Sequence, residues 1–238
     1  MKTTLTEYLK QPKKDNLINT AIDDYLSDIH YFTAENAKII IFEAHMGPEM
    51  FNHVSVKPFI DGLSQMFIFP FKISHRIFDS AEGLSAYTKY PKGMWTDPDT
   101  LNTPIFLFSF HGSPGKPETI LGKISSENLL DCFDGGFDIN PNILVFNSCS
   151  LFGGEKGQKL AIELIKKSGT RAVLGFSETL QWNTASITLL LFLSRFIDCN
   201  FPFEDLPDIF TSIIHDFLPS GRDLGFSLFL NPDFYPGK

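Results

Sequence analysis

Short runs of apolar residues recur along the chain, and each run is followed by glycine, proline or polar positions. A strand that is apolar on consecutive positions is covered on both faces, as in a parallel sheet with helices on either side. This pattern predicts an α/β fold with a mainly parallel central sheet flanked by helices on both faces. The strands that we predict cover residues 37–43, 72–78, 106–111, 142–149, 171–176 and 225–230.

Between these runs, apolar residues recur every three or four positions, which is typical of one face of a helix. We predict helices within residues 51–69, 81–90, 125–133, 157–168 and 184–199, a weaker helix over 17–29, and a short strand or hairpin at 120–124. Ser125 or Ser126 can cap the helix at 125–133, and Gly169 ends the helix at 157–168. The whole chain, 1–238, is predicted to be one domain, with residues 1–35 as a helical lead-in.

The composition fits one substantial hydrophobic core, because 43% of the 238 residues are hydrophobic. The net charge is -8 with no long basic block, which argues against a nucleic-acid partner. The apolar run at 187–193 is far shorter than the roughly 20 residues that span a bilayer, so we predict a buried helix there and no membrane contact. Three separated cysteines without a C-x-x-C pair indicate a reducing compartment, and a cytoplasmic location is expected.

Two predicted strands end near side chains that can act together in catalysis. The strand at 106–111 leads to His111, and the strand at 142–149 leads to Cys149. Carboxyl ends of parallel strands meet at one edge of a sheet, and a right-handed crossover between neighbouring strands would bring the two residues together. A thiolate attacks a carbonyl after a base takes the thiol proton, and an imidazole can return this proton to the leaving amine. The backbone N–H groups of Gly112 and Cys149 are the candidate oxyanion donors.

Two motifs carry a family resemblance: a strand followed by His111-Gly112, and Asn147-Ser148-Cys149-Ser150 with glycines after it. They resemble the motifs of the caspase-like cysteine peptidases, which include caspases, metacaspases, separases, gingipains and CHAT domains. The second motif is similar to the metacaspase Asp-Ser-Cys-His-Ser-Gly, and the segments at 149–154, 160–175 and 224–233 are similar to CHAT domains. The resemblance implies a caspase-hemoglobinase fold with Cys149 as nucleophile, His111 as general base and acid, and no metal or cofactor.

In the family that the chain resembles, the residue at position 147 lines the primary specificity pocket; metacaspases have Asp there and caspases Gln, whereas this chain has Asn147. The loops after the first strand and after residues 171–176 also line that pocket, which adds Glu43, Ser177 and Glu178 as candidate substrate-binding residues. A buried carboxylate would favour a lysine or arginine side chain of the substrate. The basic residues with which caspases hold aspartate are not evident. Glu43 and Glu178 are equally compatible with solvated loop charges.

The sequence therefore predicts a cysteine endopeptidase that hydrolyses peptide bonds of a specific partner protein, with a basic residue at the cleavage site. The resemblance further implies a role in a prokaryotic antiviral-defence or cell-death system, with a regulatory or activating protein partner. The main alternative is a catalytically silent caspase-like module that binds a partner protein. A third possibility is a cysteine-dependent amidohydrolase that acts on small molecules.

Other chemistry-bearing residues are expected to be structural. Cys132 and Cys199 are predicted to pack in helices. His45, His53 and His75 lack a metal-binding spacing such as H-E-x-x-H, so no metal site is predicted.

Overall fold

The structure is a computed structural model that describes residues 38–44, 55–67, 71–89, 93, 103–133, 142–198, 201, 203–217 and 224–236. The chain divides into two compact units, residues 1–31 and 32–238. The first unit and the predicted lead-in at 1–35 lie outside the described residues, as do His45, His53 and Cys199. All that follows concerns the second unit, and a single domain over 1–238 stays a prediction.

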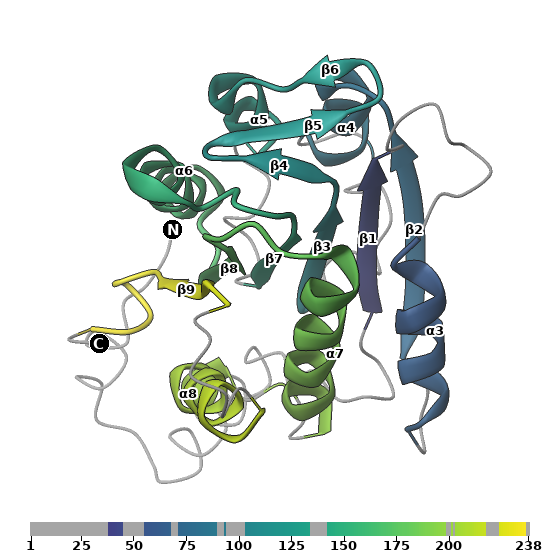
Figure 1. Cartoon of the computed structure of the whole chain (residues 1–238), viewed down its shortest axis with the longest axis vertical. Helices are drawn as coiled ribbons and strands as arrows, with labels where there is room; N and C mark the ends of the chain where they lie inside the picture. The colour runs from purple at the N-terminus through teal and green to yellow at the C-terminus, as the bar shows by residue number, and fades with distance from the viewer. Residues whose placement is uncertain are drawn as a thin grey trace, which may run out of the picture. The chain divides into compact units, whose positions relative to one another are not determined.

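Within the described residues, a central sheet contains six strands in the order β2-β1-β3-β7-β8-β9 (Figure 1). Neighbours from β2 to β8 pair in parallel, whereas β9 pairs antiparallel with β8. The strands are β1 (Lys38–Ala44), β2 (Lys72–Phe78), β3 (Ile105–Ser109), β7 (Ile143–Asn147), β8 (Ala172–Phe176) and β9 (Phe226–Leu230). β1, β3, β7 and β8 are buried at every position, as their continuous apolar runs predict.

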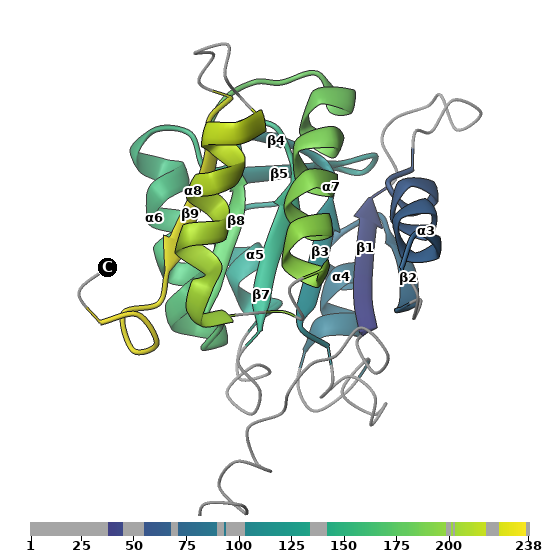
Figure 2. The ribbon, with the colours of Figure 1, turned by 90° about the horizontal axis from the view of Figure 1, so that it is seen from below.

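Helices cover both faces of this sheet, so the predicted fold class is confirmed. One face carries α3 (Lys57–Gln65), α7 (Trp182–Asp198) and α8 (Leu206–Phe217), which Figure 2 shows in front of the strands. The opposite face carries α4 (Ala81–Thr88), α5 (Ser126–Asp131) and α6 (Gly154–Ser168). Each face has its own hydrophobic cluster. No helix in the described part of the chain is long and apolar enough to cross a bilayer.

Local chemistry explains where several helices start and stop. The Ser125 side chain accepts a hydrogen bond from Asn128 N and caps α5, as predicted. Gly169 ends α6 with a φ of 67°, a left-handed conformation that suits glycine. The helix α8 was not predicted, although Pro207 stands in its first turn and apolar residues at 206, 209, 210 and 213 have helical spacing. A short 3₁₀ turn, Phe203–Asp205, precedes it.

A second, smaller sheet follows β3 and corrects one prediction. It consists of β4 (His111–Ser113), β5 (Lys116–Thr119) and β6 (Gly122–Lys123), all antiparallel. The predicted strand at 106–111 is therefore wrong at its end, because β3 stops at Ser109 and His111 begins β4. The tight turn at Gly115, whose φ is 73°, folds β5 back onto β4, so His111 pairs with β5 instead of continuing the large sheet. The hairpin predicted at 120–124 is confirmed in β5 and β6.

Candidate active site

The His-Gly and Ser-Cys motifs meet through their backbones at the carboxyl edge of the large sheet. The Phe110 N–H donates to the carbonyl of Asn147 at 3.3 Å, just before each motif begins. A Cβ atom built on Gly112 would lie 2.2 Å from Ser148 Oγ and 2.7 Å from the carbonyl oxygen of Cys149. Only glycine fits at position 112, and the space that its missing side chain leaves is filled by the segment that carries the cysteine.

The Cys149 side chain is partly buried, and its Sγ donates a hydrogen bond to the carbonyl of Leu180 at 3.0 Å. His111 lies on the exposed first position of β4. Among the described residues, no hydrogen bond joins Sγ to His111. Catalytic hydrogen bonds are often long or misaligned when no substrate is bound.

The turn that carries Cys149 is fastened to the loop after β8. Ser150 has a left-handed φ of 52°, which is uncommon for a residue other than glycine. Its N–H donates to the Glu178 carbonyl at 2.9 Å, and its Oγ lies 2.7 Å from Thr179 Oγ1. Phe152 N adds a bond to the Phe176 carbonyl at 3.0 Å. These contacts hold a strained backbone beside the sulfur, which is the kind of constraint that clusters at functional sites.

A row of three polar side chains crosses the same edge of the large sheet. Glu43, Ser109 and Asn147 are register partners on β1, β3 and β7, so their side chains share one face. Asn147 is only 3% exposed, and its Nδ2 donates to Ser109 Oγ at 3.4 Å and to Ser186 Oγ on α7 at 3.3 Å. Its Oδ1 is buried without a hydrogen-bond partner. A buried acceptor without a partner costs stability unless a water or a bound group satisfies it.

Glu43 is fully buried in this row and its oxygens are occupied from within the chain. Oε2 accepts from Ser55 Oγ at 2.6 Å and contacts His75 Nε2 at 2.8 Å, while Oε1 accepts from Val56 N at 2.9 Å. Burial opposes ionisation of the carboxyl, but the bonds from His75, Ser55 and Val56 outweigh it and hold the pKa of Glu43 below its usual range. Glu43 is therefore a buried carboxylate and not a solvated loop charge.

Ser177 and Glu178 lie in the loop that fastens the cysteine turn. Both the N–H and the Oγ of Ser177 donate to the carbonyl of Gly225, just before β9, at 2.7 and 3.1 Å. Glu178 is exposed, and its recorded contact with the site is made by its backbone carbonyl. The structure thus links these two residues to the support of Cys149, while Asn147 and Glu43 belong to the polar row.

Two residues of α7 were not predicted as part of the site. Ser186 bonds Asn147, and Trp182, one turn earlier on the same helix face, has a buried Nε1 without a hydrogen-bond partner. The Trp182 ring packs against Phe59 of α3 in an edge-on contact, with ring centroids 5.4 Å apart. The spacing of four between these residues indicates a shared face, but no sequence pattern connects that face to Asn147.

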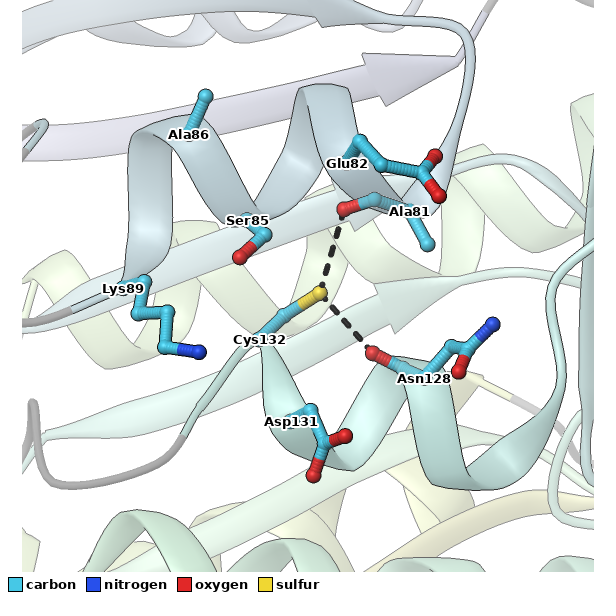
Figure 3. Close-up of a pocket in the computed structure, with 8 residues that line it drawn as sticks. All are labelled: Ala81, Glu82, Ser85, Ala86, Lys89, Asn128, Asp131 and Cys132. Atoms are coloured by element: carbon cyan, nitrogen blue, oxygen red, sulfur yellow. Dashed lines mark hydrogen bonds between the residues drawn. The ribbon is translucent and has the colours of Figure 1, made fainter.

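The described residues contain no group of three or more His, Cys, Asp and Glu side chains that could hold a metal ion. Cys132 ends α5 beside a pocket of about 640 Å³ between α4 and α5 (Figure 3). Its Sγ donates to the carbonyls of Asn128 and Ala81 at 3.1 and 3.5 Å. Burial raises the pKa of the Cys132 thiol to about 12. This thiol is neutral near pH 7, in agreement with the predicted packing role.

Comparison with known proteins adds little beyond the fold. No protein-family model matches the chain, and no curated protein matches it. Among solved structures, the chain is similar to the crystal structure of the Drosophila initiator caspase Dronc, with a TM-score of 0.49 and 14% identity, covering 87% of this chain and 86% of that chain. This likeness concerns the fold alone.

Proposed function

We propose that the chain is a caspase-like cysteine endopeptidase in which Cys149 is the nucleophile and His111 the general base and acid. One observation carries the proposal: Gly112 packs directly against Ser148 and Cys149, so the residue after the histidine touches the residue that bears the thiol. The strained, hydrogen-bonded turn at Ser150 supports it, because such a turn fixes the direction of the cysteine side chain. The CHAT-like and metacaspase-like motifs support the same assignment.

The proposed reaction proceeds in two steps. Cys149 Sγ leaves the Leu180 carbonyl and gives its proton to His111, and the thiolate attacks the peptide carbonyl carbon. The N–H groups of Gly112 and Cys149 stabilise the oxyanion, and His111 returns the proton to the departing amine. Water, deprotonated by His111, then hydrolyses the thioester and restores the thiol.

The polar row supports a preference for a basic residue on the acyl side of the cleaved bond. Glu43 supplies a buried negative charge, and Asn147 Oδ1 offers an unpaired acceptor two residues before the nucleophile. A lysine or arginine side chain would satisfy this acceptor, and the Trp182 ring can lie against its alkyl stem or its cation. An aspartate at this position of the substrate would meet the like charge of Glu43.

A catalytically silent module that binds a partner protein is the second candidate. The hydrogen bond from Cys149 Sγ to the Leu180 carbonyl favours it, because this bond directs the thiol to a backbone oxygen of the chain itself. The two candidates differ in whether Cys149 reacts when a peptide is offered.

A peptidyl acyloxymethyl ketone separates the two candidates. We expect wild type to be labelled once, at Cys149, with a lysine or arginine peptide, and the Cys149→Ala variant to remain unlabelled by intact mass. Cys132→Ala is the matched control and should label like wild type, because its thiol is buried and neutral. His111→Ala should slow labelling by about 100-fold or more. Unlabelled wild type in both buffer and source-cell lysate would favour the binding module.

A peptide library tests the substrate preference separately. We expect cleavage of peptides with lysine or arginine before the scissile bond to exceed that of aspartate or leucine peptides. Glu43→Gln should reduce the lysine and arginine rates relative to the leucine rate. Equal cleavage rates for peptides with any residue before the scissile bond would exclude a role of Glu43 in substrate preference and would leave the proposed dyad intact. Hydrolysis of small amides alone would point to an amidohydrolase.

The resemblance also supports a selective target protein in a prokaryotic antiviral-defence or cell-death pathway, within the cytoplasm. Comparison of new protein N-termini in source cells that express wild type or Cys149→Ala would identify such a target. One or a few cleavage sites are expected; broad degradation would contradict a selective role.

A further inference from the structure

The small sheet that carries His111 also carries a charged row on the same face. His111 on β4 is the register partner of Glu118 on β5, and Glu118 is the register partner of Lys123 on β6. Side chains of directly opposed residues in an antiparallel pair lie on one face with Cβ atoms about 4.5–5.5 Å apart. Glu118 therefore stands between an imidazole and an ammonium group.

Glu118 forms an ion pair with Lys123, while its position in the sheet register faces His111. Lys123 Nζ lies 2.9 Å from Glu118 Oε1, and the Glu118 side chain is 33% exposed. The hydrogen bond from Lys123 lowers the pKa of Glu118, burial opposes this slightly, and a bond from Ser113 and the charges of Lys123 and His111 lower it further. Glu118 is thus ionised at neutral pH, and the charge of His111 is the smallest of the causes that favour its ionised form.

Resting on the proposed function, we infer that Glu118 is a positioning residue that stabilises the protonated form of His111, and that Lys123 limits this effect by competing for the same carboxylate. The His111 imidazolium exists after the Cys149 thiolate has formed and before the amine leaves. Stabilising the imidazolium therefore extends the pH range over which the thiolate and the imidazolium exist together. Glu118 acts through His111 and does not touch the substrate.

Two other titratable groups lie on the segments that contact β4. Lys116 on β5 is the register partner of Ser113, and Cys149 lies on the turn against which Gly112 packs. Only Glu118 is directly opposite His111 in the sheet register.

The charged row of His111, Glu118 and Lys123 leads to two predictions of opposite sign for the titration midpoint of His111. Glu118→Gln removes the anion, so the titration midpoint of His111 should move down by about half a pH unit. Lys123→Met removes the competing cation, so the midpoint should move up by a smaller amount. If the ion pair served only to hold the hairpin together, both substitutions would break the same contact and act in the same direction.

Proton NMR of the full chain in a Cys149→Ala background measures this midpoint without any need for peptidase activity. His111→Gln identifies the resonance among the 6 histidines. The Glu163–Lys166 pair on α6, at 3.0 Å, is the matched control, and Glu163→Gln and Lys166→Met should leave the midpoint unchanged. The shifts should shrink in 1 M salt, as expected for exposed charges at about 3 Å screening length.

In the active enzyme, the alkaline limb of kcat/KM should move with the NMR midpoint in each variant, and Glu118→Asp should restore most of the wild-type profile. Unchanged midpoints, or midpoints that move in the same direction in Glu118→Gln and Lys123→Met, would overturn the inference. The inference would also be overturned if the His111 midpoints shifted in opposite directions while the alkaline limb of the kcat/KM profile stayed in place. A chain that cleaves no peptide but shows the opposite shifts would instead overturn the proposed function and keep the electrostatic coupling.

Discussion

Two neighbouring rows cross β1, β3 and β7 on opposite faces of the sheet, and they differ completely in chemistry. One row is Phe42, Phe108 and Phe146, whose rings stack with centroids 5.1 and 4.9 Å apart and no exposed surface. The other row, one residue later in each strand, is Glu43, Ser109 and Asn147. The first row leaves no atom unsatisfied, whereas the second leaves Asn147 Oδ1 without a partner.

The difference shows how one sheet separates stability from chemistry. The side chains of a strand alternate between faces, so a single step along three strands changes a fully apolar layer into a polar one. The phenylalanine row contributes burial to the fold. The polar row contributes hydrogen bonds in place of apolar packing, and it lies at the edge of the sheet that leads to Cys149.

The sharpest test of this contrast compares adjacent residues in β3. Phe108→Ala should destabilise the fold by about 3–5 kcal/mol, because it removes a ring packed against Phe42, Phe133 and Phe146. Ser109→Ala should cost about 1 kcal/mol or less. Denaturant unfolding of both variants measures the two values, and similar losses would contradict the separation.

Gly112→Ala should cost about 1–3 kcal/mol and abolish labelling of Cys149, because the added methyl meets Ser148 Oγ and the backbone oxygen of Cys149. Gly62→Ala in α3 is the matched control: no atom lies within 4 Å of the added methyl, so stability should stay equal or rise by about 0.5–1 kcal/mol. Unfolding curves and ketone labelling report both effects. Full labelling of Gly112→Ala would mean that this close contact does not position the thiol.

Glu43→Gln should reduce stability at pH 7 by about 1–3 kcal/mol, because bonds to a buried carboxylate are lost or weakened. The folded-state pKa of Glu43 is lowered, so its stabilisation is fully present above the unfolded value of about 4.3 and is lost as the pH falls through the folded pKa. The difference in unfolding free energy between wild type and Glu43→Gln should therefore become smaller in acid. Urea unfolding between pH 7 and pH 3 measures this difference, with the exposed residue variant Glu155→Gln as the control. A difference that stays constant over this pH range would exclude the linkage between Glu43 ionisation and stability.

The smallest effect on stability is expected for Asn147→Leu. Leucine removes the unpaired Oδ1 and the long bonds to Ser109 and Ser186 together, so stability should change by about 1 kcal/mol or less. Cleavage of basic peptides should nevertheless fall strongly relative to leucine peptides. Phe146→Leu, one residue earlier, should show the reverse: a measurable loss of stability with the peptide preference retained. A loss of stability in Asn147→Leu as large as in Phe146→Leu would contradict the comparison.

Much of the fold could be predicted because local signals and packing agree. The boundaries of β2 follow its sequence pattern, Ser125 caps α5, and Gly169 ends α6. The helical spacing of α8 is also visible in the sequence, although it was not predicted, but the antiparallel direction of β9 could not be read in the same way. Strand direction depends on which neighbour pairs with the strand, and this is set by contacts between residues distant in the chain.

The candidate site was predicted only in part for the same reason. The sequence predicts His111 and Cys149 as a catalytic pair, but it does not reveal that His111 belongs to a separate small sheet with Glu118 opposite it. The internal partners of Glu43, the contact of Ser186 with Asn147 and the Leu180 carbonyl beside the sulfur depend on tertiary packing. None of these leaves a periodic signal.

The anchoring of the Ser177 loop to Gly225 has a consequence for how the molecule is made. The loop that presents the Leu180 carbonyl to the thiol is secured by a residue synthesised well after Cys149 itself. On the ribosome, Cys149 emerges before the residue that anchors this loop. A nascent or clipped polypeptide that ends before Gly225 therefore carries the Cys149 thiol without the two hydrogen bonds that anchor the neighbouring loop.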